Sequence, residues 1–264
     1  MKRLLAGIFD PAGRAECTRL ADALTPSRAT VVRCGPLHVA FSGPVCPARE
    51  PLCLFDGFLD NAADVAHALG RPEVDEPETL IACAYRRWGG DLLRRLRGDF
   101  ALLVWDSLQG EGLIARDQLG VRSMFLHDGP GGLCFAGEIG QLLALLPTRP
   151  APDPEGVASW IVARGRPGSG TLYAGVRRLD PGAVLLLGRG ATRQHRYWTP
   201  RFVDPLDVSQ PELDGIVRES IGRAVRRRLS AGGITGVMMS GGLDSSSVAA
   251  VAAVQAPGRV AACS

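Results

Sequence analysis

The sequence has no run of 18 apolar residues, so no segment is long enough to cross a membrane as a helix. Its first residues carry too few apolar side chains before Asp10 for the core of a secretory signal peptide. Aromatic residues make up only 6% of the chain, and no basic patch is interleaved with them, which argues against nucleic-acid binding. We therefore expect a cytoplasmic protein that binds neither a membrane nor nucleic acid.

Metal and disulfide patterns are also missing. The seven cysteines form no Cys-x-x-Cys pair and have no histidine at a metal-site spacing, so we expect cytosolic thiols that are mostly buried. The chain has 264 residues, of which 46% are hydrophobic, enough for a packed core in one or two domains. Its net charge of +3 is only mildly basic, and the arginines at 223 and 226–228 are interpreted as a solvated helix face.

Residues 1–146 show short apolar runs separated by turn residues, such as Phe100–Trp105 and Glu111–Ala115. Helical spacing is limited to residues 61–69 and 78–88. This pattern predicts antiparallel hairpins packed in layers. Residues 147–205 are rich in proline and are interpreted as a connecting segment with strand-like pieces, notably Val184–Leu187.

A different pattern begins at Pro211. The next helix places these apolar residues on one face: Leu213, Ile216, Val217, Ile221, Val225 and Leu229. Gly232 and Gly233 end that helix, and Ile234–Met239 is an apolar run typical of a buried parallel strand. A helix over Ser246–Val254 and a second strand from Arg259 follow. This order predicts the beginning of an α/β nucleotide-binding domain at residues 206–264.

A loop rich in glycine and serine joins that strand to the following helix. Glycines allow a close backbone approach to an anion, and the helix N-terminus offers N–H groups and a positive dipole end. Asp244 would repel a phosphate directly, so we expect it to act through Mg²⁺. The loop lacks the lysine of P-loop NTPases and the spacing of the dinucleotide fingerprint. The predicted site for ATP and its pyrophosphate comprises Met239, Ser240, Gly241, Gly242, Leu243, Asp244, Ser245 and Ser246.

This loop resembles the pyrophosphate-binding loop of the ATP pyrophosphatases, and several upstream segments resemble the asparagine synthetase family in the same order. The segments are Leu96–Ala101 with Trp105-Asp106, Ala115–Arg122, Phe135–Ile139, Thr171–Gly182 and Tyr197-Trp198. The resemblance implies an α+β αββα sandwich of the Ntn-hydrolase (class II glutamine amidotransferase) type, followed by the incomplete start of an α/β, Rossmann-like ATP-pyrophosphatase domain. Within this pattern, Arg116 and Asp117 are interpreted as a structural ion pair at the domain junction.

The glutaminase residues that the family implies are largely lost. The family's nucleophilic cysteine aligns with Arg3, whose guanidinium has no usable nucleophilic lone pair. The family's Asn-Gly pair reads Asp56-Gly57, and a carboxylate there would repel a developing oxyanion. The family's Arg-Gly-Pro-Asp stretch is reduced to residues 34–37, and only Glu76 matches the acidic residue that holds the substrate amine. We expect no catalytic residue for glutamine hydrolysis.

A ligase without a glutaminase needs another amine, as in β-lactam synthetases and lasso-peptide cyclases. The resemblance implies that ATP and Mg²⁺ activate a carboxylate of a small molecule or peptide, and that an amine then displaces AMP. Two alternatives stay open: an asparagine synthetase homologue that uses ammonia, and a non-catalytic remnant or partner-binding protein. Because family members continue well beyond the second strand, in which Ser264 falls, we expect a fragment, a truncated frame or half of a split enzyme. Such a chain would need a complementing C-terminal polypeptide or a second copy of itself.

Overall fold

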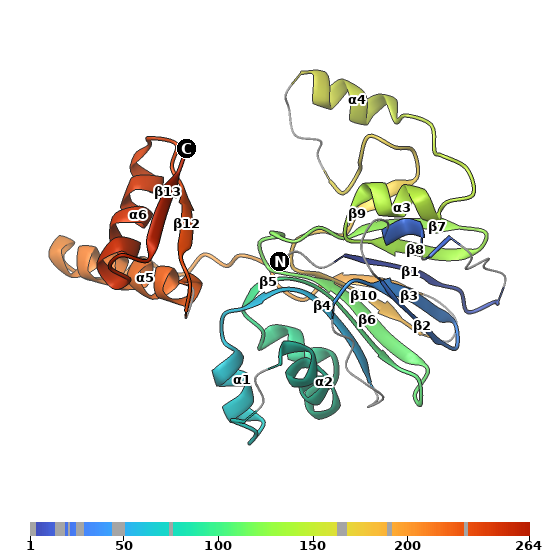
Figure 1. The fold of residues 1–264 in the computed structure, drawn as a ribbon, viewed down its shortest axis with the longest axis horizontal. Helices are drawn as coiled ribbons and strands as arrows, with labels where there is room; N and C mark the ends of the chain where they lie inside the picture. Colours follow the sequence, from blue (N-terminus) through green and yellow to red (C-terminus); the bar gives the residue numbers. More distant parts are fainter. Residues whose placement is uncertain are drawn as a thin grey trace. The chain divides into compact units, whose positions relative to one another are not determined.

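The computed structural model describes residues 4–13, 19–20, 22–24, 29–43, 51–73, 76–162, 168–188, 192–229 and 232–264. The chain forms two compact units, Met1–Pro200 and Arg201–Ser264 (Figure 1). Among the helices of the described residues, none combines the length and apolar character that crossing a bilayer requires.

The first unit is built on two antiparallel sheets. The six-stranded sheet has the order β2-β3-β1-β8-β7-β9. Its strands are β1 (Leu5–Phe9), β2 (Thr30–Cys34), β3 (Leu37–Phe41), β7 (Phe125–Gly129), β8 (Gly132–Ala136) and β9 (Val176–Arg178). The five-stranded sheet has the order β11-β10-β6-β5-β4. Its strands are β4 (Leu52–Leu59), β5 (Gly98–Asp106), β6 (Glu111–Arg116), β10 (Ala183–Leu187) and β11 (Arg193–Arg196).

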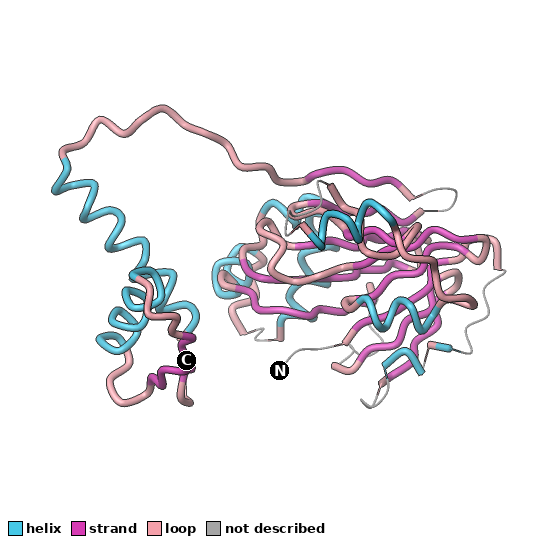
Figure 2. Tube along the Cα trace, turned by 90° about the horizontal axis from the view of Figure 1, so that it is seen from above, coloured by secondary structure: helices cyan, strands magenta, loops and turns pink. Residues whose placement is uncertain are grey.

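Helices cover the outer faces of the two sheets (Figures 1 and 2). The five-stranded sheet is covered by α1 (Ala62–Ala68), α2 (Pro77–Trp88) and the 3-10 helix η3 (Gly89–Arg94). The six-stranded sheet is covered by α3 (Ile139–Leu145) and the 3-10 helix η2 (Asp22–Leu24). A further helix, α4 (Pro154–Ile161), follows α3. The expected αββα sandwich is therefore confirmed.

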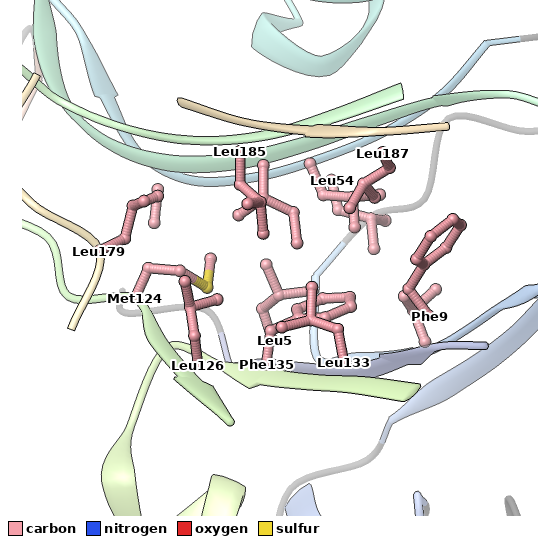
Figure 3. Close-up of a cluster of buried hydrophobic side chains, with 14 of the residues drawn as sticks. Leu5, Phe9, Leu54, Met124, Leu126, Leu133, Phe135, Leu179, Leu185 and Leu187 are labelled. Carbon is pink, nitrogen blue, oxygen red and sulfur yellow. The ribbon is translucent and has the colours of Figure 1, made fainter. Parts of the chain in front are cut away.

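Alternation along the strands produces this layering. In β5, Ala101, Leu103 and Trp105 enter the core between the sheets, while Phe100, Leu102 and Val104 pack under the helices. In β1, Leu5 and Phe9 point into the inter-sheet core, and the Phe9 ring meets Trp105 edge-on at 5.5 Å. Figure 3 shows side chains from both sheets meeting in this core. Because side chains alternate between faces along a strand, each sheet can supply two cores at once.

The predicted connecting segment contributes more strands than its composition suggests. Val184–Leu187 lies in β10, which pairs with β6, and β9 pairs with β7. Strand β11 extends the five-stranded sheet by pairing with β10. Three strands from residues 147–205 are thus part of the first unit's two sheets.

The second unit has the predicted order of elements. It contains α5 (Gln210–Arg228), β12 (Thr235–Met238), α6 (Leu243–Gln255) and β13 (Val260–Cys263). Strands β12 and β13 pair in parallel, and α6 packs on α5, where Gln255 donates to the carbonyl of Gly222 at 2.9 Å. A parallel pair joined by a helix is the expected start of an α/β domain.

Candidate functional site

The glycine- and serine-rich loop lies between the end of β12 and the start of α6. The Met239 N–H donates to the carbonyl of Cys263 at 2.6 Å, which ties the start of the loop to the neighbouring strand. Gly241 has a φ of 78°, the left-handed region that glycine adopts without strain. No heavy atom lies within 4 Å of a Cβ built on Gly241, so the space beside its backbone is open.

Serine hydroxyls hold the loop in shape. The Ser240 hydroxyl lies 3.3 Å from that of Ser245, and the Ser240 N–H donates to the same Ser245 oxygen at 3.3 Å. Ser245 in turn donates to the carbonyl of Gly242 at 3.2 Å. Ser246 begins the intrahelical bonding of α6 by donating its N–H to the Gly242 carbonyl at 3.1 Å. The loop is therefore folded back against the first turn of the helix.

The arrangement has the chemistry of an anion site. The N–H groups in the first turn of a helix have no intrahelical acceptor, and the helix dipole places partial positive charge there. Gly241 and Gly242 remove side-chain bulk from the approach, while the exposed Asp244 stands in this first turn. The residues thus fit a pyrophosphate group bound with Mg²⁺, which commonly takes one or two carboxylates together with phosphate oxygens. Asp244 is the one carboxylate among residues 239–246, so it is the side chain of this loop that could ligate Mg²⁺.

In the first unit, the Asp56-Gly57 pair lies in β4. Asp56 is buried, and its carboxylate lies 3.8 Å from a guanidinium nitrogen of Arg122. This ion pair was not predicted, because 66 positions separate the two residues in the sequence. A Cβ on Gly57 would lie 2.0 Å from the carbonyl oxygen of Asp99, so β4 and β5 can approach only with glycine at this position. Close packing of the two strands therefore explains the glycine at position 57 without any role in glutamine hydrolysis.

Two other positions that align with glutaminase residues of the family are Glu76 and Arg3. Glu76 is the N-cap of α2, and its carboxylate accepts the Thr79 hydroxyl at 3.2 Å. Arg3 lies outside the described residues.

Arg116 and Asp117 are structural, but their hydrogen bonds go to backbone groups. The Arg116 guanidinium donates to the carbonyls of Leu179, Gly120 and Arg122. Burial lowers the pKa of Arg116, and the neighbouring Asp117 partly offsets this effect. Asp117 accepts four backbone N–H groups at 3.0–3.3 Å, from Phe100, Leu119, Val121 and Arg122. The two side chains therefore join β6 to the loop that follows it and to residues near β10.

Comparison with known proteins identifies two domains in this chain. A family model described as a glutamine amidotransferase domain matches residues 72–198, and one described as asparagine synthase matches residues 216–264. A putative glutamine-hydrolysing asparagine synthetase of Mycobacterium tuberculosis is 31% identical over 225 residues, which is 79% of this chain and 34% of that protein. The chain belongs to the asparagine synthetase family.

Another curated protein and a solved structure are also similar to this chain. Amidase chry2 of Gibberella zeae is 33% identical over 219 residues, which is 81% of this chain and 31% of that protein. The chain thus spans about a third of the length of these curated relatives. The B. subtilis glutamine phosphoribosylpyrophosphate amidotransferase, complexed with ADP and GMP, aligns with a TM-score of 0.47 at 14% identity. That alignment covers 96% of this chain and 58% of the other.

Proposed function

We propose that this chain carries the nucleotide-binding start of an ATP-dependent carbon–nitrogen ligase that works without glutamine hydrolysis. The reaction would join a substrate carboxylate to AMP, release pyrophosphate, and transfer the acyl group to an amine with loss of AMP. The loop between β12 and α6 is the observation that carries the proposal. It combines an open backbone at Gly241, a helix N-terminus and a carboxylate at Asp244.

The residues of the loop would act by position and charge. Backbone N–H groups of residues 241–245 and the hydroxyls of Ser240 and Ser246 would hold the β- and γ-phosphates, while Asp244 would hold Mg²⁺. Mg²⁺ supplies charge neutralisation on the departing pyrophosphate. Fixed donors of this kind stabilise charge as it develops, without reorganising water. Ser245 would keep the loop folded through its contacts with Ser240 and Gly242.

The loss of glutaminase chemistry is supported by two positions. Arg3 replaces the family's nucleophilic cysteine, and the buried Asp56 replaces the asparagine that would donate to an oxyanion. The Arg122 guanidinium compensates the Asp56 charge within the protein. An internal amine of the substrate would then be the nucleophile, which makes lactam formation or peptide cyclisation the product class that we propose.

Two other functions have their own support. The relatives named as asparagine synthetases favour the synthesis of asparagine from aspartate and ammonia. A role as half of a split enzyme, or as a non-catalytic remnant, is favoured by apolar exposure in the second unit. Ile216 and Val217 on α5 are 43% and 48% exposed, and Met238 on β12 is 77% exposed. A complementing polypeptide or a second copy could cover such a surface.

Titration calorimetry with MgATP and with magnesium pyrophosphate tests the proposal on the full chain. We expect Mg²⁺-dependent binding of both that Asp244→Asn weakens and that Asp207→Asn, at another exposed position of the second unit, leaves unchanged. Glutamine added to the chain should release no ammonia. Absence of Mg²⁺-dependent binding in the chain, and also after mixing with the C-terminal half of a family member, would overturn the ligase proposal in favour of the remnant.

The substrate class is tested separately. Once binding is established, exchange of labelled pyrophosphate into ATP should be measured with the complemented protein and a panel of carboxylates. Exchange that depends on aspartate would favour the asparagine synthetase function. Exchange that depends on a carboxylate carrying its own amine would support cyclisation.

A further inference from the structure

A cavity of about 570 Å³ lies on the helix-covered face of the six-stranded sheet in the first unit. Its floor is a row of side chains from three adjacent strands. Cys134 on β8 is directly opposite Ile8 on β1 and directly opposite His127 on β7. Residues paired in this way project from the same face of a sheet, with Cβ atoms about 5 Å apart. The register therefore places a thiol and an imidazole side by side in the cavity floor.

A backbone carbonyl orients the imidazole. His127 Nδ1 lies 3.0 Å from the carbonyl oxygen of Gly175. Since a carbonyl oxygen can only accept, Nδ1 carries a proton in this contact, and Nε2 is the ring nitrogen left to accept one. His127 is thus held in the tautomer that can take a proton from a neighbouring thiol.

The positively charged Arg19 lines the cavity. The Arg19 Nη1 donates to the carbonyl of Leu146 at 2.8 Å, which fixes the guanidinium beside the end of α3. A guanidinium has five donors, so this bond leaves capacity for a carboxylate. The rest of the wall is mostly apolar, from Leu145, Leu146, Pro147 and Pro150, with Thr148 and the turn Gly129–Gly132. Such a lining suits a small molecule with a short apolar body and one negative charge.

We propose that Cys134 is a nucleophilic thiol whose cavity accepts small carboxylates that carry a leaving group on the α-carbon. His127 Nε2 takes the thiol proton, and the sulfur lone pair forms the carbon–sulfur bond. The bond to the leaving group breaks at the same time, and that group departs with the electron pair. Arg19 holds the carboxylate, while His127 serves as the base. Nucleophile–base couples of this kind are the usual means of activating a cysteine.

Iodoacetate and iodoacetamide are matched probes, because they differ chiefly in the carboxylate. The alkylation rate of each cysteine is followed by peptide mass spectrometry of the full chain. Cys83 is the internal control, since it is half-buried and lies 3.8 Å from a guanidinium nitrogen of Arg71 but lies outside the cavity. We expect the iodoacetate-to-iodoacetamide rate ratio at Cys134 to exceed that at Cys83 about tenfold, as one charge-assisted hydrogen bond allows.

Two variants separate the roles. Arg19→Gln should lower the iodoacetate rate at Cys134 and leave the iodoacetamide rate unchanged. His127→Asn should slow both reagents at Cys134 and shift the pH profile of alkylation to higher pH, while the Cys83 rates stay constant and report an intact fold. Equal rate ratios at Cys134 and Cys83, or an Arg19→Gln variant with wild-type selectivity, would overturn the proposal.

Discussion

Replacement of Gly241 by alanine should weaken nucleotide binding in addition to its small cost to folding, whereas the same replacement at Gly258 should affect folding alone. Gly241 and Gly258 both have left-handed backbones, with φ values of 78° and 71°, and neither has a heavy atom within 4 Å of a Cβ built on it. A left-handed residue with a Cβ costs about 1–2 kcal/mol. Gly241→Ala and Gly258→Ala should therefore lower the free energy of unfolding by the same small amount.

If the loop binds phosphate as proposed, the two variants should differ only in that binding. Gly241 lies in the loop before α6, whereas Gly258 lies in the turn between α6 and β13. A methyl group at 241 would occupy the open space through which an anion reaches the backbone. Each hydrogen bond to a charged group contributes about 1.5–3 kcal/mol, so loss of one contact should weaken binding about 10–100-fold.

The assay is calorimetric titration with magnesium pyrophosphate, combined with urea unfolding of both variants. Gly258→Ala should bind like the unaltered chain after correction for its stability. If both variants lose binding equally, the effect arises from folding and the loop has no special role. If Gly241→Ala binds as well as the unaltered chain, the assignment of the loop to phosphate is refuted.

Three further predictions concern the rest of the chain. Asp117→Asn should lower the free energy of unfolding by about 3 kcal/mol, because an amide cannot accept all the backbone N–H groups that the buried carboxylate accepts. Asp128→Asn, at an exposed ion pair, should change it by less than about 1 kcal/mol, and urea titration measures both variants. Hydrogen bonds from the Ser209 hydroxyl and N–H lower the pKa of Glu212. The capping of α5 should therefore be present above the pKa of the unfolded carboxyl group and be lost as pH falls through the lowered pKa of the folded state. Circular dichroism should show that Glu212→Gln loses less helix in acid than the unaltered chain. Burial, with a smaller effect of Glu111, raises the pKa of Tyr85 to about 12. The stability of the fold should therefore be intact below pH 10 and fall between pH 10 and 12. In thermal melts, Tyr85→Phe should remove part of that fall.

The sandwich and the loop could be predicted from the sequence because both depend on local patterns. The unbroken apolar run Phe100–Trp105 in β5 predicts a strand buried on both faces, and Gly241-Gly242 between an apolar run and a helix predicts a tight turn at the helix N-terminus. These signals span fewer than about ten residues, the length of an ordinary strand or turn. Local chemistry therefore determined the elements and the candidate nucleotide site.

Contacts between distant segments could not be predicted in this way. The ion pair of Asp56 with Arg122 joins β4 to the loop after β6, and nothing near either residue indicates its partner. The pairing of His127 with Cys134 depends on the register of β7 against β8, and a shift of one residue would send one of them to the other face. Such juxtapositions follow from the assembled sheet.

The pattern of kept and altered family positions has a physical explanation in the first unit. Gly57 and Gly98 face each other's strands so closely that a Cβ would lie 2.0–2.1 Å from a backbone oxygen, so substitution of either would separate β4 from β5. Asp117 holds four backbone groups of the turn that follows β6. These positions on which the sheet depends lie in the segments that resemble the family's motifs, whereas the same resemblance implies that Arg3 and Asp56 depart from the residues expected for glutamine chemistry. Under our proposal that the domain no longer hydrolyses glutamine but is still needed as a folded body, substitution at the first group of positions would be penalised by unfolding.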